Sequence, residues 1–209
     1  MYSNRSKLAL GFGVALALVL TLNSFLNSPM SICTCKCPAV HSANRHVTSA
    51  AGFNPSPERA IMAFNEANLE GSDKGTPGHS YDIMYGPFLA PFLDQPVRVL
   101  EIGVEDGRSL KLWQRLFPYH QRIVGIGYGG GKEVKDTFRR DIADKHVLYT
   151  GSQDDPTFLD RVKADLGNVK FDIIIDDGSH VPWHQIFTLE YLFKDSLKDG
   201  GIYIIEDIE

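Results

Sequence analysis

The chain has 209 residues, of which 43% are hydrophobic, a composition typical of a globular protein with a packed core. Its length suggests one domain with additional segments. The formal net charge is -5 and no block of basic residues is present, which argues against a nucleic-acid partner.

The first 28 residues contain an uncharged apolar run from Leu8 to Leu22, with Arg5 and Lys7 before it. A membrane-spanning helix needs about 20 apolar residues, whereas the core of a signal peptide is shorter. No clear cleavage site follows closely, so we expect residues 1–28 to form a signal anchor, a transmembrane helix. The preceding positive charges predict a single-pass protein with a lumenal C-terminal domain in the endoplasmic reticulum or Golgi. Secretion after signal cleavage is the alternative.

Residues 29–57 are rich in Ser, Ala, Asn, Pro and His and are expected to form a flexible stem. All three cysteines, Cys33, Cys35 and Cys37, lie there. Such a C-x-C-x-C run binds metal, forms disulfides or accepts acyl chains, and the sequence leaves these alternatives open.

Residues 58–209 carry a pattern in which predicted strands alternate with predicted helices. Pro57 suits the first turn of a helix, and a second helix is predicted for Tyr81–Leu93. The predicted strands that follow are Val97–Ile102, Arg122–Ile126, His146–Tyr149, Phe171–Ile175 and Gly201–Ile205. The helices between them are predicted at Ser109–Phe117, Glu133–Asp141, Pro156–Leu166 and Trp183–Phe193. This alternation predicts an α/β fold with a Rossmann-like, doubly wound parallel sheet.

The chain stops at Glu209, shortly after the fifth predicted strand. A complete domain of this class continues with a further helix and strands, so we expect a truncated domain. A fragment, a short gene model and a decayed copy all fit that expectation. An absent neighbour would leave the backbone of the last strand unpaired.

A glycine turn follows the first of these strands, in the segment from Glu101 to Ser109. Gly103 and Gly107 allow a tight turn and a close approach of the backbone to a ligand. Ligands of open parallel sheets bind beyond the carboxyl ends of the strands. Because the segment is not G-x-G-x-x-G, the pattern favours a nucleotide-like cofactor other than a dinucleotide.

Acidic residues follow the fourth and fifth strands, at Asp176-Asp177 and at Glu206-Asp207. Neighbouring parallel strands lie about 5 Å apart, so Asp177, Glu206 and Asp207 are expected to meet at one edge. Clustered carboxylates repel one another unless a cation neutralises them, and oxygen ligands suit Mg²⁺, Ca²⁺ or Mn²⁺. His180 would then lie beside the ion as a proton acceptor. The alternative is a helix cap and two solvated loop charges.

Four motifs together resemble the metal-dependent sugar O-methyltransferases of macrolide antibiotic biosynthesis, with the cephalosporin-hydroxylase-like proteins as close relatives. The motifs are DKGT-x-x-HSYD (Asp73–Asp82), VLEIGV-x-x-G-x-S (Val99–Ser109), IIDDGSH (Ile174–His180) and GG-x-Y-x-x-ED (Gly200–Asp207). The resemblance runs from about residue 68 to the end of the chain. It implies a class I methyltransferase that uses S-adenosylmethionine (SAM) and Mg²⁺.

The resemblance also implies roles for particular residues. His180 would be the general base for a sugar or polyol hydroxyl, and the segment from Lys74 to Tyr81 would help close over cofactor and substrate. The metal ligands would be Asp177, Glu206 and Asp207. The cofactor-binding residues would be Glu101, Gly103, Gly107, Ser109, Gln153, Asp154 and Asp176, with Gln153 and Asp154 near the adenine.

One departure from the family pattern lies at the end of the second strand, where the family has an acidic residue for the ribose and this chain has Gly127. Loss of a charged hydrogen bond costs about 1.5–3 kcal/mol. The departure therefore keeps a second interpretation open, a membrane-tethered, inactive binding protein with this fold. A hydroxylase is disfavoured, because no 2-His-1-carboxylate pattern is evident.

Overall fold

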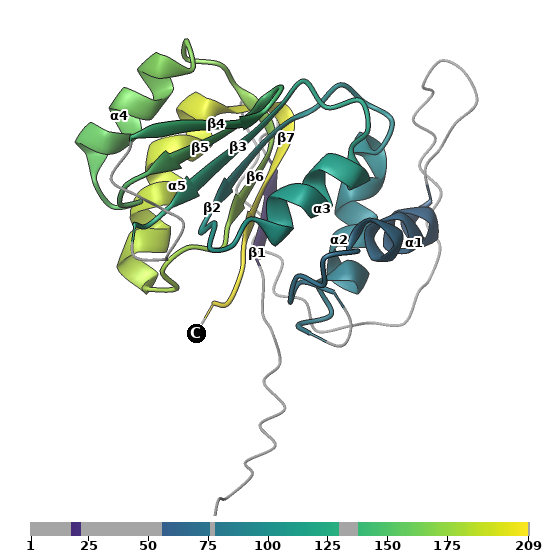
Figure 1. The fold of residues 1–209 in the computed structure, drawn as a ribbon. Helices are drawn as coiled ribbons and strands as arrows, with labels where there is room; N and C mark the ends of the chain where they lie inside the picture. Colours follow the sequence, from purple (N-terminus) through teal and green to yellow (C-terminus); the bar gives the residue numbers. More distant parts are fainter. Residues whose placement is uncertain (1–17, 22–55, 76–77, 130–137, 209) are drawn as a thin grey trace, which may run out of the picture.

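The computed structural model describes residues 18–21, 56–75, 78–129 and 138–208. Their centre is a seven-stranded sheet in the order β1-β7-β6-β2-β3-β5-β4 (Figure 1). The strands are β1 (Leu18–Thr21), β2 (Arg98–Ile102), β3 (Arg122–Gly127), β4 (Arg139–Ala143), β5 (His146–Thr150), β6 (Phe171–Asp176) and β7 (Leu197–Ile205). The helices are α1 (Pro57–Ala67), α2 (Tyr81–Leu89), the 3-10 helix η1 (Ala90–Phe92), α3 (Arg108–Leu116), α4 (Pro156–Asp165) and α5 (Pro182–Ser196).

The five central strands are mutually parallel, as predicted: β7, β6, β2, β3 and β5. Two antiparallel strands, β4 and β1, flank them, so the sheet is mixed rather than purely parallel. From β2 the chain builds outward in both directions, first through β3 and β5 and later through β6 and β7. The boundary between β2 and β6 is therefore the switch point at which open α/β sheets bind ligands.

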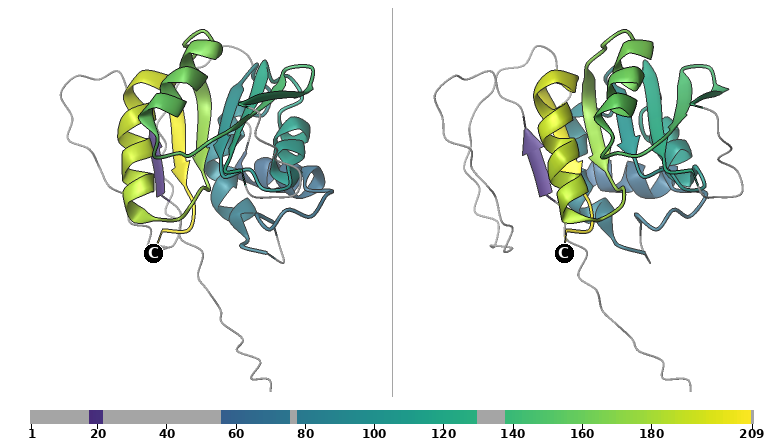
Figure 2. Two further views of the ribbon diagram at one scale, coloured as in Figure 1. Left: turned by 60° about the vertical axis from the view of Figure 1, so that its left-hand side comes forward. Right: turned by 90° about the vertical axis from the view of Figure 1, so that its left-hand side faces the viewer.

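Helices cover both faces of the sheet. Helices α1, α2 and α3 pack on one face and α4 and α5 on the other (Figure 2). Successive residues of a strand point to opposite faces of the sheet. Val99 and Ile173 therefore pack in the core under α1, α2 and α3, and Leu100 and Ile174 pack in the core under α4 and α5. Burial on both faces explains the continuous apolar sequence of β6.

The first helix begins where the sequence predicts it. The Ser56 side chain accepts a hydrogen bond from the Arg59 backbone N–H at 3.2 Å, and Pro57 occupies the first turn. The second predicted helix is shorter than expected, because the α-helix ends at Leu89 and continues as η1.

Two segments differ from the sequence prediction. The helix predicted from Glu133 to Asp141 is wrong at its end, since β4 begins at Arg139; residues 130–137 lie outside the described part. Every residue of β4 is exposed, so no apolar pattern marks this edge strand.

The predicted anchor of residues 1–28 is described at Leu18–Thr21 alone, and there it is a strand, not a helix. This strand pairs antiparallel with β7, with Leu18 opposite Ile205, so the outer edge of β7 is paired where an open edge was expected. Within the described ranges, no helix is both long and apolar enough to span a bilayer. The stem up to residue 55, with its cysteines, falls outside those ranges.

Candidate functional site

The register of the parallel strands aligns three strand ends at one edge of the sheet. Ile102 of β2 lies opposite Asp176 of β6, and Asp176 lies opposite Ile205 of β7. The next residues of the three strands, Gly103, Asp177 and Glu206, therefore leave the sheet side by side. Their order is fixed by backbone hydrogen bonds from Asp177 N to Ile102 O and from Glu206 N to Asp176 O, both 2.9 Å.

Gly103 makes the close approach of β2 and β6 possible. Its φ is 103°, in the left-handed region, and a Cβ at this position would collide with the carbonyl oxygen of Asp177. The prediction of a glycine turn at the end of β2 is confirmed in that respect.

Two cavities adjoin at Gly103, which lines both. The first, of about 680 Å³, lies toward α1 and α3 and is lined by Asn65, Asn68, Asp73, Lys74, Ser109 and Asp177 among others. The second, of about 490 Å³, is lined by Tyr128, Ser152, Gln153, Asp154, Ser179 and His184 among others. Because Gly103 lines both cavities, a ligand that spans them would pass over this turn.

Some of the predicted cofactor residues of the first motif line the cavities and others do not. Gly103 and Ser109 line the first cavity, and the Ser109 hydroxyl donates to Glu101 Oε2 at 2.7 Å. Glu101 itself is fully buried behind them. Gly107 borders neither of these two cavities; it precedes the first turn of α3 in a left-handed conformation.

A buried polar network supports the floor of the second cavity. The Gln153 amide donates to Asp176 Oδ1 and to the Thr188 hydroxyl, each at 3.1 Å, and its oxygen accepts from Ser179 N at 2.7 Å. Burial raises the pKa of Asp176 to about 7. Gln153 thereby ties β6 to the loop after β5.

His184 links two residues of the second cavity's rim. Its Nδ1 lies 2.8 Å from the Ser179 hydroxyl and its Nε2 lies 3.2 Å from Asp154 Oδ2. The predicted adenine neighbour Asp154 is therefore held by an imidazole on α5.

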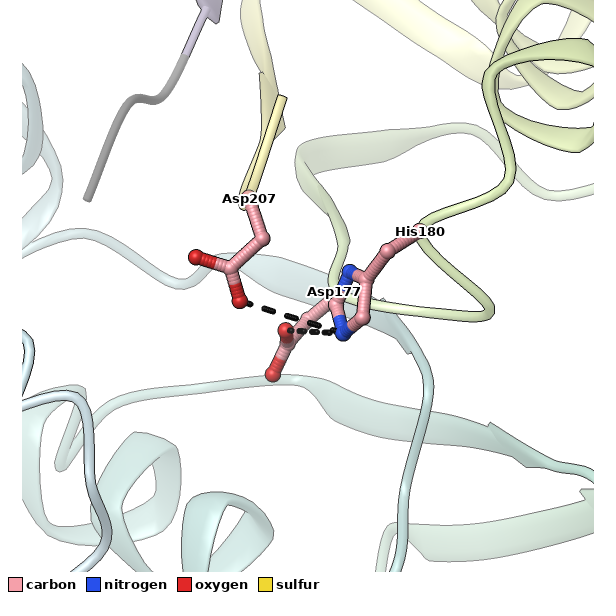
Figure 3. A group of neighbouring side chains, drawn as sticks. All are labelled: Asp177, His180 and Asp207. Carbon is pink, nitrogen blue, oxygen red and sulfur yellow. Dashed lines mark ion pairs between the residues drawn. The ribbon is translucent and has the colours of Figure 1, made fainter. Parts of the chain in front are cut away.

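Asp177, His180 and Asp207 form a group that could hold a metal ion (Figure 3). One ligand atom from each lies within 4.8 Å of the others. His180 Nε2 is 3.9 Å from Asp177 Oδ1 and 3.8 Å from Asp207 Oδ2, so the ring faces both carboxylates. Oxygen ligands of this kind suit a hard divalent cation, and the residues present fit one.

The backbone at this group is held in an unusual conformation. His180 and Asp207 both have positive φ, 56° and 49°. Non-glycine residues rarely adopt this region, and its cost of order 1–3 kcal/mol is commonly found at functional sites. Tyr81 fixes Asp207 from the other side, because its hydroxyl donates to Asp207 Oδ1 at 2.5 Å and accepts from Asp207 N at 3.2 Å.

Glu206, the third predicted ligand, is not a member of that group. Its carboxylate is buried and accepts hydrogen bonds from Lys74 Nζ, at 2.8 and 2.9 Å, and from the Tyr85 hydroxyl. The structure thus brings together two of the three predicted ligands with His180, and places the third beside a lysine. Burial raises the pKa of Glu206 to about 8, although the Lys74 charge opposes this.

Lys74 is the cation at the centre of these buried acids. It is 2% exposed, donates to Asp177 and Glu206, and lies 3.6 Å from Glu101 Oε1. Burial alone would lower the pKa of Lys74, but the carboxylates of Glu206, Glu101 and Asp177 outweigh it and raise the pKa above the ordinary value. Burial also raises the pKa of Asp177 and of Glu101. Lys74 carries one positive charge against three carboxylates, so it does not fully neutralise them.

Gly127 ends β3 beside the second cavity. A Cβ there would lie 2.7 Å from the carbonyl oxygen of Val104, so this turn has no room for a carboxylate side chain. The following residue, Tyr128, lines the cavity and is 78% exposed.

Three side chains at the site were not assigned individual roles from the sequence: Lys74, Tyr81 and Tyr85. They come from α2 and the loop before it, and no spacing rule connects them with β7. The DKGT-x-x-HSYD motif was the available signal, because it contains Lys74 and Tyr81.

The mixed seven-stranded sheet with helices on both faces fits the class I methyltransferase α/β fold. Solved structures support this at a TM-score of 0.56 and 29% identity, for the MycE methyltransferase from the mycinamycin biosynthetic pathway in complex with Mg and SAH. A second MycE structure, which also contains mycinamycin VI, matches with a TM-score of 0.55 and 30% identity. These matches cover 70% of this chain and 39% and 38% of the MycE chains.

Curated relatives name the family. The 8-demethyl-8-(2-methoxy-alpha-L-rhamnosyl)-tetracenomycin-C 3'-O-methyltransferase of Streptomyces olivaceus is 40% identical over 146 residues, which are 66% of this chain and 34% of the relative. The mycinamicin VI 2''-O-methyltransferase of Micromonospora griseorubida is 36% identical over 137 residues, 62% of this chain and 32% of the relative. No protein-family model matches. The homologues are thus sugar O-methyltransferases of the mycinamicin and tetracenomycin type, which supports placing this chain in their family. It spans about a third of the length of these two relatives.

Proposed function

We propose that this protein is a SAM- and Mg²⁺-dependent O-methyltransferase that acts on a hydroxyl of a sugar or another polyol. The observation that carries the proposal is the Asp177, His180 and Asp207 group at the carboxyl edge of the sheet, next to the cavities that meet at Gly103. The homologous sugar O-methyltransferases support the reaction class, and the MycE structures support the pair of cofactors.

The cofactor would lie across Gly103. Its amino-acid end would occupy the first cavity near Ser109, and its adenosine the second cavity near Gln153, Asp154 and Tyr128. SAM supplies an electrophilic methyl group when bound. The fixed turn orients the ligand, and positioning of the two reactants is a large part of catalysis in such sites.

Asp177 and Asp207 would hold the cation. A bound divalent cation lowers the pKa of a hydroxyl that it coordinates. His180 would accept the hydroxyl proton at Nε2, the nitrogen that faces both carboxylates. Tyr81 would keep Asp207 in place during the transfer. Glu206 stays a predicted ligand, whose carboxylate would have to change partners to reach the ion.

Isothermal titration with SAM, with and without Mg²⁺, tests the proposal. We expect a binding heat in the presence of Mg²⁺, and a loss of the Mg²⁺ dependence in Asp177→Asn. Asp172→Asn is the matched control, because Asp172 is the second residue of β6 and pairs with Lys198 at the end of the strand opposite to Asp177. An absence of SAM heat under both conditions contradicts the proposal.

The alternative is an inactive binding protein with the same fold. Gly127 favours it, because the tight turn leaves no place for a ribose-binding carboxylate. Titration heat from SAM together with no methyl transfer to any sugar or polyol tested would support this alternative.

A further inference from the structure

Lys74 reaches the carboxylates from a fixed backbone. Tyr81 N donates to the Lys74 carbonyl at 2.8 Å, and His79 N donates to the carbonyl of Asp73 at 2.6 Å. These bonds anchor the main chain of the loop. The side chain spans from there to Asp177 and Glu206, so the ammonium can change partners while the backbone stays in place.

Asp177 is shared between two cation positions. Its Oδ2 accepts from Lys74, whereas its Oδ1 faces His180 in the group that could hold a metal. Two cations on one carboxylate repel each other, and buried charges are screened less than exposed ones. A divalent ion near Asp177 therefore weakens the interaction between Lys74 and Asp177.

A second partner for the ammonium is already within reach. Glu101 Oε1 is buried, lies 3.6 Å from Lys74 Nζ, and has no hydrogen-bond partner among the residues that the structure describes. Lys74 also lines the first cavity. A buried carboxylate oxygen without a donor is costly, and it gains one when the lysine moves toward it.

We propose that Lys74 is a tethered cation that competes with the divalent ion for Asp177 and Glu206 and shifts to Glu101 when the ion binds. The inference rests on the proposed function, because it takes the divalent ion as given. It explains why Glu206 is paired with a lysine although the sequence predicts it as a metal ligand. The lysine neutralises part of the acidic charge without the ion and sets how much ion is needed to load the site.

The first test is Mn²⁺ binding to the full chain, followed by the loss of the free-ion signal in electron paramagnetic resonance. We expect Lys74→Met to bind Mn²⁺ about tenfold more tightly than the unaltered protein, because a competing charge is gone. Lys198→Met is the matched control: it removes another lysine that pairs with an aspartate, and it should leave Mn²⁺ affinity unchanged. Equal or weaker binding by a folded Lys74→Met protein would overturn the proposal.

A second test uses the unaltered chain, since loss of Lys74 leaves buried acids unpaired and can prevent folding. The rate of reductive methylation of Lys74 is measured by mass spectrometry with and without saturating Mn²⁺, and Lys198 is the internal reference. We expect Mn²⁺ to change the Lys74 rate, because the ammonium exchanges its partners, and to leave the Lys198 rate unchanged. If Mn²⁺ binds but the methylation rate of Lys74 does not change, the proposed exchange of partners is wrong and the proposed function still stands. A failure to bind Mn²⁺ contradicts the proposed function and the exchange together.

Discussion

At the scale of single residues, the acidic side chains of the site are paired with a positive charge from a distant part of the sequence. Asp177 and Glu206 emerge from adjacent strands, and their balancing charge, Lys74, comes from a loop over a hundred positions earlier. The motifs allowed Asp177, His180 and Asp207 to be predicted as neighbours, because parallel strands end at a common edge. The lysine was not predictable in this role, since no sequence spacing says which loop folds back over a strand end.

A residue-scale prediction concerns His146, which lies away from the proposed site. Burial and the neighbouring His120, whose Nε2 is 2.9 Å from His146 Nε2, lower the pKa of His146. The unfolded chain therefore takes up a proton at His146 before the folded protein does. As the pH falls below about 6.5, the ordinary pKa of histidine, we expect the free energy of unfolding to fall.

Urea denaturation at pH 7.5 and pH 5.5 measures this effect. His146→Gln should show a smaller loss of stability between the two pH values than the unaltered protein, because it removes the titrating imidazole. An equal loss in both proteins would show that other groups cause the pH dependence.

At the scale of elements, the strands that could be predicted are those with buried apolar residues on both faces. The two missed strands lie at the edges: β4 is exposed throughout, and β1 belongs to an apolar run that resembles a membrane helix. An apolar run without periodicity does not separate a strand from a helix. Membrane attachment stays a prediction that the described residues do not test.

The turn after β2 gives a prediction at this scale. Gly103→Ala should destabilise the protein by more than Gly167→Ala, since both glycines have positive φ but a Cβ at 167 meets open space. The positive φ alone costs about 1 kcal/mol, and the collision with the Asp177 carbonyl adds to it. Thermal unfolding measures the difference, and equal shifts in Tm for the two variants would contradict the close packing of β2 against β6.

At the scale of the whole molecule, the sheet order places a switch point between β2 and β6, and the cavities, the metal-competent group and Lys74 all lie at that edge. This arrangement followed from the alternation of strands and helices in the sequence. The partners of the acids, which decide whether a cation enters, depended on long-range contacts of Lys74, Tyr81 and Tyr85 with the residues that follow β7.

The most direct test is a crystal structure of the protein with Mn²⁺ and S-adenosylhomocysteine, with anomalous scattering to locate the ion. We expect an anomalous peak bound by Asp177 and Asp207, with the nucleoside beside Gln153 and the thioether near Gly103. An ion bound elsewhere, or no ligand density beside Gly103 at saturating concentrations, would contradict the assignment of this edge as the catalytic site.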